Sequence, residues 1–225
     1  MKKYVLIGTG DFANIISNTI EDAGDEVIGY VVDKKYLIEN EYMGKPVTAF
    51  ETITEDYSTD EYIPVVAFMG SKMNSQRYEK FCMLKDMGYK MDNVIHPTAS
   101  ISKRSVIGEG NVFLQFTIVA PGAVIGDCNF FSPKSYICHD VVVGSANHFS
   151  PGVSTTGFSQ IGNNCILGVN CAINNKVKVA DYTFIGGGMF ITGDTKQYDV
   201  YVPERSKPLE RIRSIDFQIF TARRR

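Results

Sequence analysis

The segment YICHDVVVGSANHFSPG, residues 136–152, holds the side chains best suited to proton transfer: His139, Asp140 and His148. An imidazole titrates near neutral pH, and a nearby carboxylate can orient it and make it more basic. Such a histidine can take a proton from an amine or a hydroxyl as that group attacks a thioester. Neighbouring residues on a strand point to opposite faces, so Asp140 need not face His139 although it is adjacent in sequence. The acid that orients His139 is therefore either Asp140 or an acid of another chain.

A six-residue period positions these side chains. Large apolar residues, with Thr155 the exception, recur at every sixth position from Ile95 to Ile191. A mostly small residue follows each of them four positions later, and both sets must point inward. Glycine often comes directly after the large residue, where we expect a corner with unusual backbone angles. The period predicts a left-handed parallel β-helix of triangular section over residues 95–198, in which each hexad forms one flat side.

His139 and His148 both fall at outward positions of this register, so we expect exposed imidazoles and exclude a core role. Exposed histidines that are merely solvated are one alternative. A metal site is another, but the two residues are nine positions apart, no HxxxH spacing occurs, and His96 lies at the very start of the repeats. Zinc sites favour closely spaced ligands, so we expect no metal.

Residues 1–94 follow a different pattern, in which strands alternate with helices. KYVLIGTG is typical of a buried strand, DFANIISNTIEDAG has the helical spacing of apolar residues, and EVIGYVVDKK is a second strand. YIPVVAFMG gives a third strand, and SQRYEKFCMLKDMGY a second helix that ends at Gly88. The alternation predicts a small parallel α/β domain, about half of a dinucleotide-binding (Rossmann) fold.

Two glycine-containing turns of this domain could hold a ligand. Gly8 and Gly10 lie in a strand-to-helix turn whose backbone N–H groups can bind phosphate, and a purely structural turn is the alternative. Asp33 ends the next strand, where an acidic side chain can accept hydrogen bonds from a ribose or a base. Gly70 and Ser71 follow the third strand, at the same edge of the sheet.

The composition narrows the function classes. A formal charge of −2, from 23 basic and 25 acidic residues, argues against nucleic acid as a partner. The five cysteines are odd in number and lack CxxC spacing, so they indicate neither a disulfide framework nor a zinc site. No stretch approaches the roughly 18 apolar residues of a membrane span. We expect a cytoplasmic protein with a small-molecule substrate and no membrane partner.

Nearly the whole chain resembles the hexapeptide-repeat sugar acyltransferases of the sialic acid O-acetyltransferase type, which include bacterial UDP-4-amino-sugar N-acetyltransferases. The similarity lies in YVLIGTGDFA, VVAFMGSKMNSQR and VIHPTASIS, and above all in CHDVVVGSANHFSPG. The last segment matches the family pattern H-[DE]-x-x-[IV]-G-x-x-x-H.

The resemblance implies a homotrimer with active sites in the clefts between adjacent β-helices, acetyl-coenzyme A as co-substrate and a nucleotide sugar as substrate. It makes His139 the general base, with Asp140 as its acidic partner. The residues that it places at coenzyme A are His148, beside the thioester carbonyl or the pantetheine, and backbone groups of Gly157, Val169 and Gly187. The residues that it places nearest the nucleotide sugar are Gly8, Gly10, Asp33, Gly70 and Ser71.

Some residues depart from the family pattern or allow two interpretations. Asp11 and Phe12 stand where the family has a small residue and a histidine or glycine, and an acidic group there would repel a diphosphate. Arg77, on the helix after the second turn, either pairs with phosphate or is solvated. In the tail, residues 199–225, the usual GxPAK is replaced by VYVPERSKPLERIR, in which Arg205, Lys207 or Arg211 could meet the coenzyme's phosphates.

The leading hypothesis is an acetyl-coenzyme A-dependent N-acetyltransferase that modifies the amino group of a nucleotide-activated amino-deoxy-sugar in surface-polysaccharide biosynthesis. O-acetylation of a sugar hydroxyl, as on a sialic acid, is a second enzymatic possibility. A non-catalytic trimeric scaffold that binds sugar nucleotides is a third, against which the paired outward histidines count.

Overall fold

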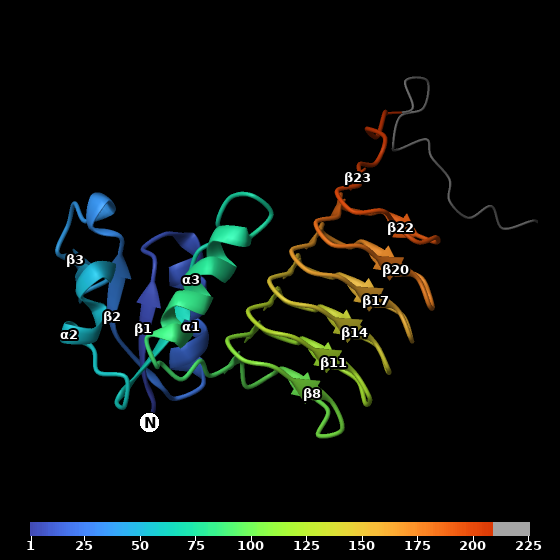
Figure 1. Ribbon diagram of the computed structural model, residues 1–225. Helices are drawn as coiled ribbons and strands as arrows, with labels where there is room; N and C mark the ends of the chain where they lie inside the picture. The colour runs from blue at the N-terminus through green and yellow to red at the C-terminus, as the bar shows by residue number, and fades with distance from the viewer. Residues whose placement is uncertain (209–225) are drawn as a thin grey trace, which may run out of the picture.

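The computed structural model describes residues 1–208, which form an α/β unit beside a prism of stacked coils (Figure 1). Residues 209–225, with Arg211 and the terminal arginines, lie outside the described residues. None of the described helices is long and apolar enough to cross a membrane.

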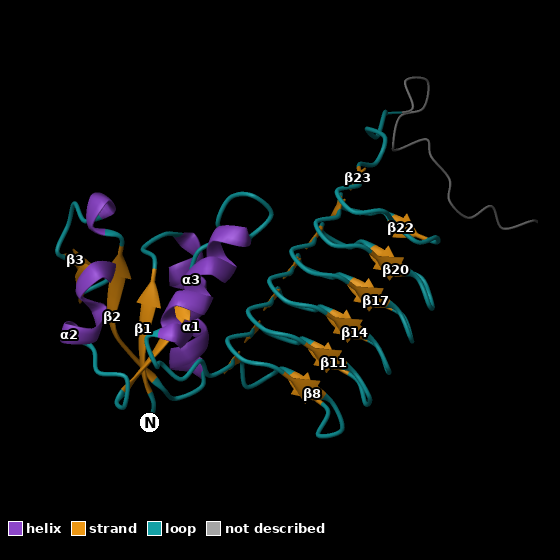
Figure 2. Ribbon diagram, viewed as in Figure 1, coloured by secondary structure: helices purple, strands orange, loops and turns teal. Residues whose placement is uncertain are grey.

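The α/β unit is built on a five-stranded sheet in the order β3-β4-β2-β1-β5, parallel except for β3 (Figure 2). Its elements are β1 (Lys3–Ile7), α1 (Asp11–Asp22), β2 (Glu26–Val32), the 3₁₀ helix η1 (Lys34–Tyr36), β3 (Glu41–Tyr42), β4 (Lys45–Ala49), the 3₁₀ helix η2 (Phe50–Thr52), α2 (Ile53–Asp56), β5 (Tyr62–Val66) and α3 (Ser75–Asp86). This confirms the predicted parallel α/β domain. The hairpin β3–β4 and the short α2 were not predicted, because they fall in a polar stretch without clear periodicity.

The remaining strands form a left-handed β-helix with three faces, which confirms the predicted fold class. The first face holds β6 (Val94–Ile95), β9 (Val112–Phe113), β12 (Phe130–Phe131), β15 (His148–Phe149), β18 (Ile166–Leu167), β21 (Phe184–Ile185) and β23 (Val200–Tyr201). The second holds β7 (Ser100–Ile101), β10 (Ile118–Val119), β13 (Tyr136–Ile137), β16 (Ser154–Thr155), β19 (Ala172–Ile173) and β22 (Phe190–Ile191). The third holds β8 (Val106–Ile107), β11 (Val124–Ile125), β14 (Val142–Val143), β17 (Gln160–Ile161) and β20 (Lys178–Val179). The strand β23 lies in the segment that the sequence assigned to the tail.

Each strand pairs with the strand one coil later, so that Ile118 is opposite Tyr136 and three hexads make one coil. The second residue of each strand from β6 to β22 is the large residue of the six-residue period. All of these except Ile95, which is 41% exposed, lie inside the prism with the small residues four positions later. Buried Asn111, Asn129 and Asn147 also occupy the latter positions. They stack as a ladder in which the Asn129 side-chain amide donates to Asn111 Oδ1 (3.0 Å) and to the Gly144 carbonyl (2.9 Å).

The glycines that follow the large residues serve close stacking, and the predicted unusual backbone angles are wrong for them. A Cβ added at Gly126 would lie 2.9 Å from the backbone of Gly144 in the next coil, which real Cβ atoms do not tolerate. The left-handed backbone occurs two residues further on, at Cys128 (φ 54°) and Asp140 (φ 56°), for example.

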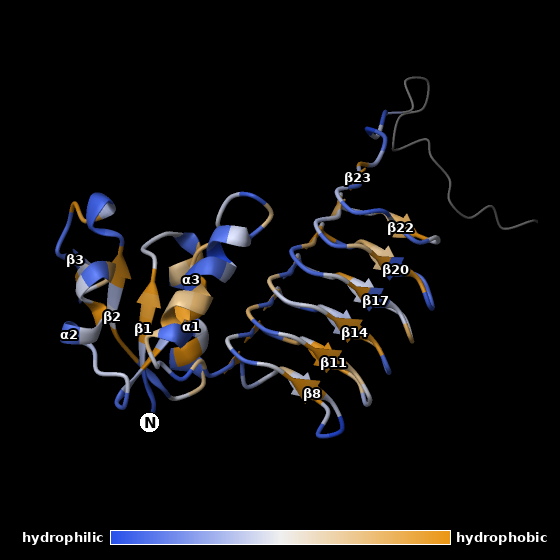
Figure 3. Cartoon of the chain, in the orientation of Figure 1, coloured by the Kyte–Doolittle hydropathy of each residue, from blue (hydrophilic) through white to orange (hydrophobic). Residues whose placement is uncertain are grey.

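The outward side chains of the third face change from apolar to polar along the prism (Figure 3). Val106, Val124 and Val142, on β8, β11 and β14, are 64%, 42% and 44% exposed. The equivalent residues further along are Gln160 and Lys178. Nothing in residues 1–208 covers this valine stripe.

The α/β unit packs against the first face of the prism. Phe12 of α1 contacts Phe130 of β12, with ring centroids 4.9 Å apart, and Val94, Val112 and Leu114 belong to the same buried cluster. The core of the small unit therefore continues into the outer surface of the β-helix.

Buried polar groups on the α3 side also join the two units. Asn74 Nδ2 donates to the Ala146 carbonyl (3.1 Å), and Arg77 Nη2 donates to the Asn147 carbonyl (2.9 Å). Arg77 is 2% exposed, and its Nε and Nη1 have no partner among the described residues. Both interpretations of Arg77 from the sequence, phosphate pairing and solvation, are therefore wrong: it ties α3 to the prism.

His148 is buried at this junction, so the expectation of an exposed imidazole is wrong for it. It does point outward from the prism, but it is 6% exposed because it stacks on Phe130 (5.3 Å between centroids) and meets Phe12 (5.8 Å). Its Nδ1 is buried without a hydrogen bond. Burial lowers the pKa of His148 to about 4, and the positive charge of Arg77 acts in the same direction.

His148 should therefore make folding sensitive to acid. Between pH 7 and pH 4 the unfolded imidazole, with its ordinary pKa of 6.5, binds a proton that the buried imidazole does not bind, so falling pH favours the unfolded chain. We expect this residue alone to lower the free energy of unfolding by about 3 kcal/mol across that range. Urea unfolding at a series of pH values checks this. Between pH 7 and pH 4 the free energy of unfolding should fall by about 3 kcal/mol less in His148→Gln than in the wild type. A His148→Gln profile parallel to that of the wild type would contradict the expectation.

Candidate active site

His139 lies at the corner between the second and third faces, in the turn from β13 to β14. Asp140 occupies the left-handed position of that turn (φ 56°), which aspartate tolerates better than most residues. The turn is also fixed from the next coil, because the buried Thr155 hydroxyl donates to the Tyr136 carbonyl (3.3 Å) and accepts from Cys138 N (3.3 Å). This explains the polar exception in the six-residue period.

The His139 imidazole is held on three sides. Its Nδ1 lies 2.9 Å from Asp140 Oδ2, and the ring meets Phe158 edge-on, with centroids 5.2 Å apart. Gly157, one coil later, lies against the ring, where an added Cβ would be 2.7 Å from Nε2. Of the two acids left open by the sequence, the structure of the single chain thus pairs Asp140 with His139.

This arrangement leaves one ring nitrogen ready to accept a proton. A carboxylate only accepts hydrogen bonds, so the proton of the neutral ring sits on Nδ1 and the lone pair on Nε2. Nε2 makes no hydrogen bond among the described residues, and 52% of the His139 side chain is exposed. His139 is therefore exposed as expected.

The residues expected at coenzyme A divide between two corners. Gly157 shares the corner of His139, whereas Val169 and Gly187 lie in successive coils at the corner between the first and second faces. His148, on β15 of the first face, adjoins that second corner and lines a hollow together with Phe12 and Pro151. A single chain does not bring His139 together with His148, Val169 and Gly187.

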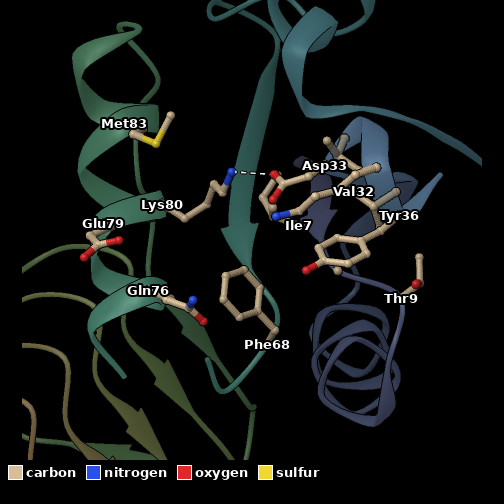
Figure 4. Close-up of a pocket in the computed structure, with 13 residues that line it drawn as sticks. Ile7, Thr9, Val32, Asp33, Tyr36, Phe68, Gln76, Glu79, Lys80 and Met83 are labelled. Carbon is tan, nitrogen blue, oxygen red and sulfur yellow. Dashed lines mark hydrogen bonds and ion pairs between the residues drawn. The ribbon is translucent and has the colours of Figure 1, made fainter. Parts of the chain in front are cut away.

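The α/β unit contains a cavity of about 470 Å³ at the carboxyl ends of β1 and β2, bounded on the other side by α3 (Figure 4). Gly8 and Asp33, two of the predicted substrate residues, line it. Ligands of open parallel sheets bind at this edge.

The other three predicted substrate residues do not line the cavity. Gly10 caps α1, and Gly70 packs against the backbone of α3, where an added Cβ would lie 3.1 Å from Arg77 N. The backbone N–H of Ser71 already donates to Gln76 Oε1 (3.0 Å). Substrate contacts by these residues stay predictions.

Sequence reasoning missed the other side chains of the cavity, among them Tyr36, Phe68 and Lys80. Phe68 could have been predicted to line the cavity, because it follows the third predicted strand at the edge of the sheet where ligands bind. Lys80 was not, because its position on α3 gives no signal until α3 is packed beside β2. Within residues 1–208, no three His, Cys, Asp or Glu side chains gather as a metal ion would require.

The cavity and His139 lie on opposite sides of the prism of their own chain. The α/β unit covers the first face, and His139 marks the corner between the second and third faces. In a triangular prism that corner is opposite the first face. A ligand held in the cavity of one chain cannot reach His139 of the same chain across the packed core.

No protein-family model matches the chain. Among solved structures, the acetyltransferase domain of PglB from Neisseria gonorrhoeae FA1090 is 22% identical, with a TM-score of 0.82 over 93% of this chain and 100% of that chain. The same domain in complex with acetyl coenzyme A gives a TM-score of 0.81 at 22% identity, over 92% of this chain and 99% of that chain.

A mutant of perosamine N-acetyltransferase from Caulobacter crescentus, in complex with CoA and GDP-perosamine, is also 22% identical. Its TM-score is 0.81, over 89% of this chain and 93% of that chain. These similarities extend over both units of the structure. The chain therefore has the fold of the hexapeptide-repeat sugar acyltransferases that its sequence resembles.

Proposed function

We propose that this protein transfers an acetyl group from acetyl-coenzyme A to the amino group of a nucleotide-activated amino-deoxy-sugar. The observation that carries the proposal is His139, an exposed imidazole fixed on a rigid corner with its Nδ1 on Asp140 and its Nε2 free. An oriented base of this kind has no use in a purely structural scaffold.

The chemistry requires one proton acceptor and no protein nucleophile. The sugar amine attacks the thioester carbonyl carbon, and His139 Nε2 takes a proton from the nitrogen as the C–N bond forms. The carbon–sulfur bond then breaks and coenzyme A leaves as a thiolate. Asp140 stabilises the imidazolium that forms, because its carboxylate already accepts from Nδ1.

The solved neighbours support both substrates of the proposal. One is a complex with acetyl coenzyme A, and another is a complex with CoA and the amino-sugar nucleotide GDP-perosamine. The cavity beside Gly8 and Asp33 is the corresponding place for a nucleotide in this chain. His148, Gly157, Val169 and Gly187 are proposed to contact coenzyme A where two prisms meet.

The active unit is proposed to be a homotrimer, in which His139 of one chain faces the substrate held by the next. The opposite placement of the cavity and His139 in one chain supports this. The exposed valine stripe, Val106, Val124 and Val142, gives such an assembly an apolar surface to bury beside the His139 corner. The five free cysteines suit the reducing cytoplasm proposed as its location.

Loss of the proposed base should lower turnover. We expect His139→Ala to reduce kcat by about 10²- to 10⁴-fold, because the amine's proton loses its acceptor. Thiol release from acetyl-coenzyme A, measured with a panel of nucleotide-activated amino sugars, checks this. The melting temperature should stay near that of the wild type because the residue is exposed. Turnover equal to the wild type would rule out the assigned role.

A side chain that crowds the His139 imidazole should also lower turnover. The Gly157→Ala methyl group occupies the space of the His139 ring and displaces it, for which we expect a fall in kcat of up to about 10²-fold. Gly193→Ala is the matched control, because an added Cβ there meets no atom within 4 Å. Equal kcat values for the two variants would show that the position of the ring does not matter.

Co-expression tests whether two chains share each site. His139→Asn removes the base, and Thr9→Trp fills the cavity, which Thr9 lines. Random assembly of the two inactive chains in equal amounts should restore about a quarter of wild-type activity if the base and the cavity come from neighbouring chains. The control joins both changes in one chain and mixes it equally with wild type. If two chains share each site, the control mixture should also show about a quarter of wild-type activity. If each site lies within one chain, the first mixture should show no activity and the control mixture about half of wild-type activity.

A further inference from the structure

An ion pair faces the cavity of the α/β unit. Lys80 Nζ of α3 lies 2.7 Å from Asp33 Oδ1 at the end of β2, and both side chains line the cavity (Figure 4). They are only 14% and 32% exposed. Neither group is used by the acetyl transfer proposed at His139.

The pair is fixed in a way that leaves hydrogen-bonding capacity unused. Lys80 Nζ also lies 3.5 Å from the ring centroid of buried Phe50, so its position is set by two partners. An ammonium group has three N–H donors, and one remains beyond those directed at Asp33 and the ring. Asp33 Oδ2 makes no hydrogen bond among the described residues. The pair therefore offers one donor beside two carboxylate acceptors.

The cavity has surfaces that suit a flat ring. The aromatic side chains of Tyr36 and Phe68 line it, and Figure 4 shows both rings below the ion pair, with Phe68 on the side of α3 and Tyr36 on the side of Thr9. Aromatic faces of this kind stack on nucleobases without regard to their identity. Discrimination must therefore come from polar groups at the edge of the base.

The geometry points to guanine as the base that this cavity selects, read by Lys80 and Asp33. The Watson–Crick edge of guanine presents one acceptor, O6, followed by two donors, N1–H and N2–H. Lys80 can donate to O6 while the two carboxylate oxygens of Asp33 accept from N1–H and N2–H. The inference rests on the proposed function in taking this cavity as the site of the nucleotide.

The same pair disfavours uracil, thymine and adenine. Uracil and thymine match it at O4 and N3–H, but their O2 would face a carboxylate oxygen, and two acceptors repel each other. Adenine fails twice, because its amino group faces the ammonium and its N1 faces the carboxylate. Buried polar groups left unpaired by the wrong ligand are what make such a site selective.

Calorimetric titration of the whole protein with nucleoside diphosphates tests the inference without acetyl transfer. GDP should bind more tightly than UDP, dTDP or ADP by between about 5- and 150-fold, the range of one good bidentate base contact. IDP, which lacks the N2 amino group, should bind more weakly than GDP. Equal affinities for GDP and UDP, or a preference for UDP or ADP, would overturn the inference.

Variants identify the residues responsible. Lys80→Met should weaken the binding of both GDP and UDP, because guanine O6 and uracil O4 both lose their donor, whereas Lys85→Met, which removes the same charge from an exposed side chain of α3 outside the cavity, should leave both affinities unchanged. Asp33→Asn turns an acceptor into a donor and should move the preference from GDP to xanthosine diphosphate, whose O2 can accept. Equal effects of Lys80→Met and Lys85→Met would overturn the base-reading role. A loss of affinity in Asp33→Asn that occurs with GDP and is absent with 2′-deoxy-GDP would also overturn it, because it would place Asp33 on the ribose.

Failure here and failure of the proposed function give different results. Preferential binding of UDP, together with His139-dependent thiol release from a UDP-amino-sugar, overturns the guanine inference and leaves the acetyltransferase proposal standing. Failure of every nucleoside diphosphate to bind overturns the guanine inference and also removes the nucleotide sugar from the proposed function.

Discussion

Stacking of the coils at an interval of 18 residues is the constraint on which the rest of the structure depends. Backbone hydrogen bonds such as Ala120 N to Ile137 O (2.9 Å) fix each coil against the next, so every residue has a set face or corner. The coils approach so closely that a side chain at one corner determines what fits above it. Gly157 over His139 is such a case, because the imidazole occupies the space of a Cβ in the next coil.

This constraint also explains why much of the fold and of the His139 site could be predicted from the sequence. The six-residue pattern is local and repeated many times, so it specifies the faces, the core and the outward exposure of His139. The residue pattern alone left the acidic partner of His139 open, because on a regular strand the two side chains would diverge, and only the family resemblance implied Asp140. Their contact depends on the left-handed turn at Asp140, where the chain leaves β13.

The surroundings of His148 and Arg77 could not be predicted, because they depend on packing between units that are far apart in the sequence. The register gave the direction of His148 correctly but said nothing of the helix that covers it. A signal did exist: Val94, Val112 and Phe130, the outward residues of β6, β9 and β12, are all apolar, which indicates a covered face. What covers that face follows only from the three-dimensional structure.

The same packing makes an assembly of chains a chemical requirement of the proposed reaction. For one chain to carry a ligand from its cavity to its own His139, the α/β unit would have to leave the first face. That movement would expose Phe12 and Phe130 and break the bonds from Asn74 and Arg77 to the prism. Buried apolar area and hydrogen-bonded polar groups both resist such a separation. The two halves of the proposed site are therefore held apart within each chain, and the proposed neighbouring prism is the simplest means of bringing an imidazole to the substrate.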